Sequence, residues 1–316
     1  MKLKTKTKKQ EKVKYTRKQM KRILKQDYPF WCLCFVPIVL IFIFRYIPMY
    51  GVQIAFRDFK LTKGIWGSEW VGLQNFKLLF RSKDFLKALK NTIELSFMRV
   101  FLYFPMPIIL ALAFNEVRNV RLRKTVQILS YAPNFISWVV IASIVKTMFG
   151  MNGPINMLVE FFGGDKILFL SKPELFKPLL VGTHIWAKVG MGSLIYTAAL
   201  TSVDKELYDA CYIDGGGRLA RIWYVCLPAI SGIIAVSFIG VFGDLMRNNF
   251  EQVFLLSNEL VYNEALTLEY YNYNVGLVQA KFSIGAATGL WLSGISLVLT
   301  VIANGIVRKV TGHGMW

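Results

Sequence analysis

Six stretches of about twenty apolar residues limit what this chain can fold into. A helix needs roughly 20 mostly apolar residues to cross the hydrocarbon layer of a bilayer, where it must satisfy its own backbone hydrogen bonds. Apolar side chains make up 54% of the 316 residues. The sequence therefore predicts an all-α, polytopic membrane protein. Its six transmembrane helices are expected at residues 29–50, 92–114, 126–148, 179–200, 229–246 and 284–307.

The chain begins with a strongly basic segment. Residues 1–28 hold twelve Lys and Arg against two acids, so they carry over half of the net charge of +19. Because this segment leads directly into an apolar stretch, the positive-inside rule favours a cytoplasmic tail over nucleic-acid binding. No A-x-A-like site follows, which favours an uncleaved span over a signal peptide. The expected organisation is this tail, a six-helix domain at 29–310 and a short cytoplasmic C-terminus at 311–316.

The connections between the spans should alternate between the two sides of the membrane. With the N-terminus inside, residues 115–125 and 201–228 face the cytoplasm, while 51–91, 149–178 and 247–283 face outward. The inner segment "NEVRNVRLRK" carries four basic residues against one acid, as the positive-inside rule requires. The first outer segment is itself basic and fits this rule less well.

Several residues in these spans are of types that lipid penalises. Arg45, Arg99 and Lys146 lie near predicted outer ends, where snorkelling to the interface is the favoured interpretation. His184 and Lys188 are one helical turn apart on the fourth span and share a face. Because Lys188 is too deep to reach the interface, it is expected to face the bundle or an aqueous cavity.

The predicted cytoplasmic loop contains the stretch "YDACYIDGGGRLARIWYVCLP", residues 208–228. Residues 202–214 are typical of a short helix, capped by Ser202 or Asp204 and stopped at Gly215. A second helix follows the glycines, with one apolar stripe made of Leu219, Ile222, Trp223, Cys226 and Leu227. This arrangement is typical of a loop that docks into another protein and transmits its movement. It lacks the Lys-Ser/Thr and the preceding strand of a P-loop, so the chain is not expected to hydrolyse ATP itself.

The loop also has a recognisable motif. Residues 209–211, Gly215 and residues 225–228 fall at the spacing of E-A-A-x-x-x-G-x(9)-I-x-L-P, with Asp for Glu, Cys for the second Ala and Val for Ile. This motif is similar to that of permease subunits of binding-protein-dependent ABC importers. The segments "RYIPMYGVQIAFRDF", "WVGLQNF", "NTIELS", "YAPNFISWVV" and "FEQVFLL" extend the likeness. The chain resembles the carbohydrate-uptake permeases, specifically the LplB-like oligosaccharide branch.

The resemblance implies a type I ABC importer permease fold and a set of partners. These are a second homologous permease, two copies of a cytoplasmic ATPase that binds ATP and Mg²⁺, and an extracellular solute-binding lipoprotein. No cofactor or metal is expected in this chain, and the membrane is expected to be the bacterial cytoplasmic membrane. The loop would act as the coupling helix. We expect Asp209, Ala210, Gly215 and Arg218 to contact the ATPase, with the apolar stripe packing on the bundle.

An oligosaccharide path should combine aromatic faces with planar polar side chains, because sugars present both C–H surfaces and hydroxyl pairs. For each aromatic, membership of an interfacial belt is the alternative to contact with the sugar. Tyr270, Tyr271 and Tyr273 are candidates for binding-protein docking or an outer gate. The candidate path residues are Asn134, Trp138, His184, Trp186, Lys188, Asn248, Asn249, Glu251 and Gln252.

Other functions remain open at this point. A permease of the same superfamily could carry a non-sugar solute, and a polytopic membrane enzyme or a stand-alone channel would share the spans. The sequence has no D-x-D, no H-E-x-x-H and no cysteine spacing typical of zinc, which disfavours an enzyme. A channel would not need the amphipathic loop. The predicted outer face is basic, which favours an acidic oligosaccharide through Arg57, Lys60, Lys63, Lys77, Arg81 and Lys83.

Overall fold

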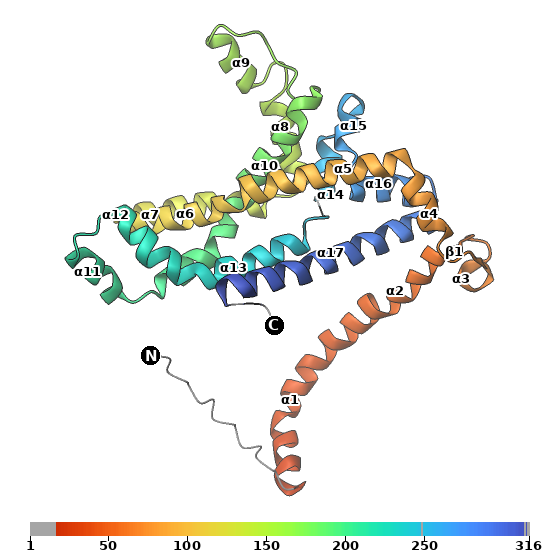
Figure 1. The fold of residues 1–316 in the computed structure, drawn as a ribbon, viewed down its shortest axis with the longest axis horizontal. Helices are drawn as coiled ribbons and strands as arrows, with labels where there is room; N and C mark the ends of the chain where they lie inside the picture. Colours follow the sequence, from red (N-terminus) through yellow and green to blue (C-terminus); the bar gives the residue numbers. More distant parts are fainter. Residues whose placement is uncertain (1–16, 248, 313, 315–316) are drawn as a thin grey trace. The chain divides into compact units, whose positions relative to one another are not determined.

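The computed structural model describes residues 17–247, 249–312 and 314, and these residues are mostly helical (Figure 1). The chain divides into two units, Met1–Gln53 and Ile54–Trp316. Residues 1–16 of the predicted tail lie outside the described residues, as do residues 313, 315 and 316 of the predicted C-terminus.

From residue 17 on, where the structure describes it, the first unit is a single run of helix. The helix Lys25–Phe56, which continues past Gln53 into the second unit, is 32 residues long and apolar enough to cross a membrane, and it includes the predicted span at 29–50. Nearly all of its described side chains are exposed, as expected for a helix whose surroundings are lipid. The run contains α1 (Arg17–Ile41), the π-helix η1 (Phe42–Tyr46), α2 (Ile47–Met49) and the start of the 3₁₀-helix η2 (Tyr50–Phe56).

The second unit holds one small antiparallel hairpin and the remaining helices. The hairpin pairs Arg57 with Trp70 and Asp58 with Glu69. In chain order the elements are β1 (Arg57–Asp58), α3 (Gly64–Gly67), β2 (Glu69–Trp70), α4 (Gln74–Arg81), α5 (Lys83–Met98), η3 (Arg99–Tyr103), α6 (Pro105–Glu116), α7 (Val120–Tyr131), η4 (Ala132–Phe135), α8 (Trp138–Met148), α9 (Pro154–Phe161), α10 (Pro173–Thr201), α11 (Lys205–Ile213), α12 (Arg218–Arg221), η5 (Ile222–Cys226), α13 (Leu227–Gly243), α14 (Phe250–Leu256), η6 (Glu259–Val261), α15 (Tyr262–Ala265), α16 (Leu268–Asn272), η7 (Tyr273–Val278) and α17 (Phe282–Thr311).

Three long helices of this unit meet the length and hydropathy of a membrane span. They are Lys83–Glu116, Arg218–Gly243 and Phe282–Lys309, and the first two are continuous through the π-helical turns η3 and η5. They contain the predicted spans at 92–114 and 284–307, and all but the last three residues of the one at 229–246. The 29-residue helix α10 contains a fourth, at 179–200, and its hydropathy is lower because it carries His184 and Lys188.

The predicted span at 126–148 is not one straight helix. The helices Val120–Phe135 and Trp138–Met148 meet at an angle of 104°. Pro133 lies in the 3₁₀ turn η4, and the Ser137 hydroxyl accepts a hydrogen bond from the amide of Val140 and so begins a new helix. The bend therefore has a local cause, since proline disfavours a continuing helix and serine favours a new N-terminus.

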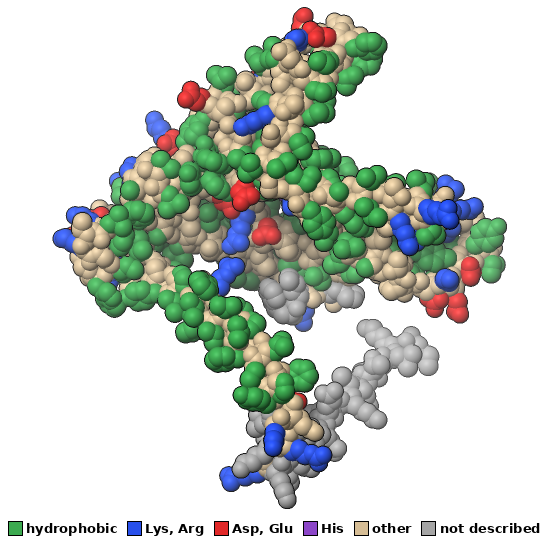
Figure 2. Space-filling view, turned by 180° about the vertical axis from the view of Figure 1, so that it is seen from behind, with side chains coloured by type: hydrophobic (Ala, Val, Ile, Leu, Met, Phe, Trp, Pro, Cys, Tyr) green, Lys and Arg blue, Asp and Glu red, His purple; other side chains and the backbone are tan. Residues whose placement is uncertain are grey.

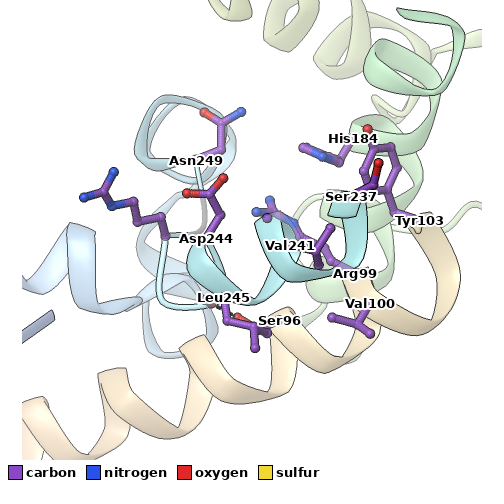
Figure 3. Close-up of a pocket in the computed structure, with 12 residues that line it drawn as sticks. Ser96, Arg99, Val100, Tyr103, His184, Ser237, Val241, Asp244, Leu245 and Asn249 are labelled. Atoms are coloured by element: carbon purple, nitrogen blue, oxygen red, sulfur yellow. Dashed lines mark hydrogen bonds between the residues drawn. The ribbon is translucent and has the colours of Figure 1, made fainter. Parts of the chain in front are cut away.

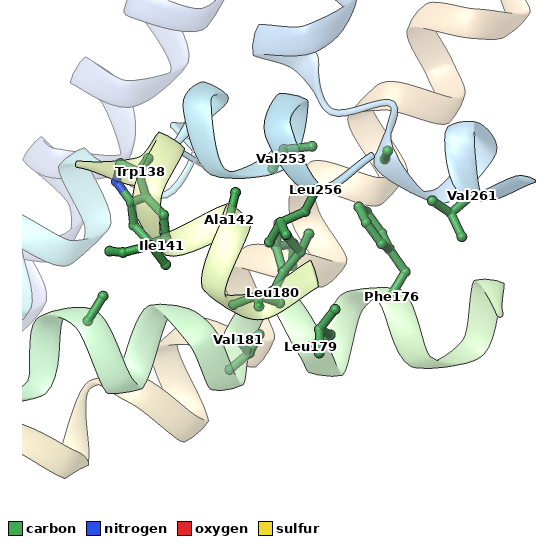
Figure 4. Close-up of a cluster of buried hydrophobic side chains, with 14 of the residues drawn as sticks. Trp138, Ile141, Ala142, Phe176, Leu179, Leu180, Val181, Val253, Leu256 and Val261 are labelled. Carbon is green, nitrogen blue, oxygen red and sulfur yellow. The ribbon is translucent and has the colours of Figure 1, made fainter. Parts of the chain in front are cut away.

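Helix α10 is central to the packing of the second unit. It packs against α6 along much of its length and also contacts α7 and α13, while α13 packs against α17. Figure 4 shows the largest buried cluster, in which α8 and α14 cover one side of α10 through Ile141, Leu180 and Leu256. Figure 2 shows hydrophobic side chains over much of the visible face of this unit, with Lys and Arg more frequent toward its ends.

Three buried asparagines hold the connections that leave the helices. Asn75 donates hydrogen bonds to the carbonyls of Ala55 and Arg57, at 2.9 and 3.0 Å. Asn91 donates to the carbonyls of Asn263 and Leu266, which fixes α15 against α5. Asn156 bonds both the carbonyl and the amide of Ile167. Because an irregular backbone must find partners when it is buried, these amides explain how short loops stay ordered here.

Candidate functional site

The loop between α10 and α12 has a defined local structure. The Asp204 carboxylate accepts a hydrogen bond from the Glu206 amide and caps α11, as one of the two predicted caps. Gly215 ends the helix at φ +77°, a left-handed conformation that glycine adopts without strain. A Cβ on Gly216 would lie 2.5 Å from Cys211 Sγ and 2.7 Å from the Cys211 carbonyl oxygen. The first two glycines of the run are therefore required by the fold of the loop, whereas a Cβ at Gly217 would meet open space.

The residues predicted to contact the ATPase lie on the surface of this loop. Asp209 and Ala210 are exposed on α11, Gly215 is exposed at the turn, and Arg218 is exposed at the start of α12. Apolar side chains surround them: Tyr212 and Ile213 are 78% and 82% exposed. The loop therefore presents a mixed apolar and charged surface that this chain leaves uncovered.

The second half of the loop differs from the prediction. It is not a separate short helix but the first part of the continuous helix Arg218–Gly243. The predicted apolar stripe is also wrong in part, because Leu219 and Trp223 are 72% and 66% exposed whereas Cys226 is fully buried. The π-helical turn η5 accounts for this, since its wider turn breaks the 3.6-residue period on which the stripe was based.

Two contacts tie the loop to the end of α6. The Tyr208 hydroxyl lies 3.5 Å from Cys226 Sγ and accepts a hydrogen bond from Asn115 Nδ2 at 3.4 Å. Burial, together with the contact to Cys226, raises the pKa of Tyr208 to about 12. Arg221 Nη2 donates to Glu116 Oε2 at 2.7 Å, between side chains that are each more than two-thirds buried. The loop is thus attached to α6 at two positions.

A half-open cavity lined by several polar and charged residues lies in the second unit, between η3, α10 and the C-terminal part of α13 (Figure 3). We call it the central cavity; its volume is about 450 Å³. Figure 3 shows His184 and Tyr103 on one side and Asp244 and Asn249 on the other. Its lining residues are Ser96, Arg99, Val100, Tyr103, His184, Ser237, Gly240, Val241, Asp244, Leu245, Arg247 and Asn249.

Four of the predicted path residues lie together beside this cavity. Lys188 Nζ donates to Asn134 Oδ1 at 3.0 Å and lies 5.9 Å from the centre of the Trp138 ring. The Trp138 ring is stacked at 6.3 Å on that of His184, which lines the cavity. The Nδ1 atom of His184 is buried without a hydrogen-bond partner in the part of the chain that is described. This placement fits the expectation that Lys188 faces the bundle rather than lipid.

The other predicted path residues are dispersed. Gln252 is fully buried and donates to the Leu180 carbonyl and to Thr183, so its amide supports the packing of α14 on α10. Its neighbour Glu251 is exposed, and Asn249 lines the central cavity with φ 53°. Trp186 lines a different, apolar pocket between α8 and α10. Asn248 lies outside the described residues.

The tyrosines predicted to form a docking patch are mostly internal. Tyr270 packs on the rings of Phe250 and Phe254, and Tyr271 packs on Phe85; both are less than 10% exposed. We therefore assign these two to the core rather than to a docking surface, because tertiary packing against α5 and α14 covers them. Tyr273 is only partly buried and lines a second cavity described below.

Arg99 is the main functional candidate that the sequence analysis did not select. The prediction that it snorkels to the interface is wrong: Arg99 Nη2 donates to Gln252 Oε1 at 2.9 Å, and the residue lines the central cavity. Asp244, Arg247 and Ser237 were also missed. The signal for Arg99 was present, since a cation within an apolar stretch is by default a candidate for an internal site.

The bundle, its cavity and its exposed loop have the architecture of a membrane permease. Residues 103–312 match the family described as binding-protein-dependent transport system inner membrane component, and the chain belongs to this family. It is accordingly a multi-pass membrane subunit of an ABC transport system that works with a binding protein.

Similar proteins agree with this assignment. The chain is 42% identical to the polygalacturonan/rhamnogalacturonan transport system permease YteP of Bacillus subtilis, over 87% of this chain and 86% of that protein. It is 38% identical to LplB of the same organism, over 93% and 92%. It also resembles a chain of a bacterial alginate ABC transporter, crystallised with an alginate-bound periplasmic protein, with a TM-score of 0.85, 34% identity and coverage of 93% and 99%. The type I permease fold predicted from the sequence is thus confirmed.

Proposed function

We propose that this permease moves an acidic oligosaccharide from an extracellular binding protein into the cytoplasm. The observation that carries the proposal is the central cavity, which presents Arg99 and Arg247 for carboxylates and Tyr103, His184 and Ser237 for ring faces and hydroxyls. The substrates of the relatives support it, since polygalacturonan, rhamnogalacturonan and alginate are all acidic polysaccharides.

The exposed loop supports the proposed assembly. A second homologous permease and two copies of a cytoplasmic ATPase complete the importer, and ATP and Mg²⁺ bind in the ATPase rather than in this chain. Asp209, Ala210, Gly215 and Arg218 are proposed to contact the ATPase, because all four are exposed on a loop that is fixed to α6. Closure of the ATPase dimer would then move the loop and re-orient the helices. Two distinct sites would thus be coupled through one element that has two alternative conformations.

The proposed location is the bacterial cytoplasmic membrane, with both termini in the cytoplasm. The basic tail supports this orientation through the positive-inside rule, and the basic segment between α6 and α7 supports it independently. In the second unit, Figure 1 places that segment and α11 toward the same end, as the alternation of sides requires.

Uptake by the reconstituted complex tests this function. Proteoliposomes that contain the complex and ATP, supplied with the loaded binding protein, should accumulate labelled oligogalacturonate, and replacing ATP by ADP should abolish uptake. Arg99→Gln should lower uptake of oligogalacturonate much more than uptake of a neutral oligosaccharide of the same length. Equal loss for both sugars would contradict the acidic specificity, and ATP-independent uptake would contradict the importer.

A further inference from the structure

A second cavity of about 710 Å³ lies beside the central cavity, among α14, α16, η7 and α17. Arg247 lines both cavities, so the two adjoin at this side chain. Of the residues predicted from the sequence for the substrate path, docking or an outer gate, Tyr273 lines this cavity. The second cavity therefore needs its own explanation.

The floor of the second cavity is made of glycine. A Cβ built on Gly285 would lie 2.7 Å from the Cα of Gly276, so these two glycines allow η7 and α17 to approach closely. Three glycines border the Asn272 side chain: a Cβ on Gly276 or Gly285 would lie 3.5 or 3.3 Å from its Oδ1, and one on Gly289 would lie 3.9 Å from its Nδ2. The Asn272 amide is therefore surrounded by positions without side chains.

This amide has no hydrogen-bond partner among the residues that the structure describes, although Asn272 is only partly exposed. Every other asparagine discussed above as a tie between segments bonds to backbone groups. A planar amide carries two donors and one acceptor, and leaving these unmatched in a half-buried site is unfavourable unless water or a ligand supplies partners. Asn272 thus offers its amide to whatever occupies the cavity.

The rest of the lining combines apolar and polar side chains, including the carboxylate of Glu269. Phe250 and Tyr273, whose ring centres are 5.0 Å apart, and Phe282 provide aromatic surface, and Ser293 provides a hydroxyl. Arg247 is exposed, and its guanidinium has no side-chain partner within the described part of the chain. A guanidinium in this position can take a carboxylate with two parallel hydrogen bonds.

We propose that the second cavity is a further sugar subsite, in which Asn272 binds hydroxyls of one sugar unit and Arg247 binds a uronic acid carboxylate at the junction with the central cavity. This inference rests on the proposed function, since it assigns a second unit of the same acidic oligosaccharide. A short sugar would occupy the central cavity alone. A longer one would extend past Arg247 into the second cavity.

The test compares two sugar lengths in reconstituted complexes. Uptake of di- and pentagalacturonate is measured for the unaltered complex, Asn272→Leu and Gly289→Ala. The leucine removes the amide, and the alanine methyl makes ordinary contact with it. Gly294→Ala is the control, because a Cβ there lies on the same helix but meets open space.

Asn272→Leu should raise the KM for pentagalacturonate about tenfold, the order expected for one lost hydrogen-bonding group. Gly289→Ala keeps the amide and only adds a methyl beside it, so it should raise this KM in the same direction by less. Both variants should leave the KM for digalacturonate within about twofold. The control should behave as the unaltered complex. Equal changes for both lengths, or no change for either, would overturn the second subsite and leave the importer intact. Absence of uptake by the unaltered complex at both lengths would instead overturn the proposed substrate, and this subsite with it.

Discussion

Arg221, on the first turn of the Arg218–Gly243 helix, donates a hydrogen bond to Glu116 at the C-terminal end of α6, with a distance of 2.7 Å between Nη2 and Oε2. The pair joins the proposed coupling loop to a different helix from the one that the loop leads into. Charge-assisted hydrogen bonds of this kind are among the stronger polar contacts. Movement of the loop should therefore be transmitted to α6 as well as to α13.

Reversing one charge of this pair should uncouple the importer. We expect Arg221→Glu to lower ATP hydrolysis stimulated by the loaded binding protein about tenfold or more, because two carboxylates then face each other. Basal hydrolysis and assembly of the complex should persist. The exchange Arg221→Glu with Glu116→Arg should recover much of the stimulation, and Arg121→Glu, an exposed charge reversal on α7, should have little effect. Failure of the exchange to recover stimulation would contradict a role for the pair itself.

The glycine run predicts an unequal effect of two adjacent substitutions. Gly216→Ala should destabilise the loop by about 1 to 3 kcal/mol, because its Cβ would meet the sulfur and carbonyl oxygen of Cys211. Gly217→Ala should be nearly neutral, since no atom lies within 4 Å of its Cβ. Hydrogen exchange of the α11 amides measures the difference. Equal protection in both variants would show that the close approach at Gly216 does not matter.

The raised pKa of Tyr208 predicts that the stability of the loop depends on pH only under alkaline conditions. Its pKa is raised to about 12 in the folded chain, above the value near 10 of an unfolded tyrosine. The folded state thus holds this proton more tightly than the unfolded state does. The stability that the protonated hydroxyl contributes to the fold is therefore complete below about pH 10 and is lost as the pH rises toward 12. Protection of α11 from hydrogen exchange should fall over this range in the unaltered chain, and the fall should be smaller in Tyr208→Phe. The same pH profile in both would contradict the assignment.

Substitutions of Gln252 and of its neighbour Glu251 should differ in their effect on stability. Gln252→Ala removes hydrogen bonds to Arg99, Leu180 and Thr183 within a fully buried site, so we expect a loss of about 2 to 4 kcal/mol in stability. Glu251→Ala should change stability by less than about 0.5 kcal/mol, because Glu251 is exposed. Thermal unfolding of the purified complex compares the two. A Gln252→Ala variant as stable as the unaltered chain would remove this residue from the packing of α14.

The sequence predicted the features that depend on short-range patterns. Apolar length located the spans, and the order of Asp204, Gly215 and Pro228 located the loop and its first helix. The bend before Trp138 was also within reach, because Pro133 and Ser137 are a local break and a local start. Helical periodicity failed at Trp223, where a π-helical turn changes the register without any distinctive residue.

The contacts that build the cavities could not be obtained in this way. Arg99 meets Gln252 across 153 positions of the chain, and Asn91 meets Leu266 across 175. Tyr270 and Tyr271 are of a residue type common at interfaces, yet α5 and α14 bury them. Which polar residues line a path and which only hold helices together depends on these distant pairings, and a single sequence does not specify them.

The composition of the purified complex tests the central claim most directly. The chain is tagged at its C-terminus, extracted gently from its native membrane and weighed intact by mass spectrometry. We expect one copy of this chain with one homologous permease and two copies of an ATPase. Recovery of this chain alone, or as a homo-oligomer without an ATPase, would contradict the coupling role of the loop and reopen the channel and enzyme alternatives.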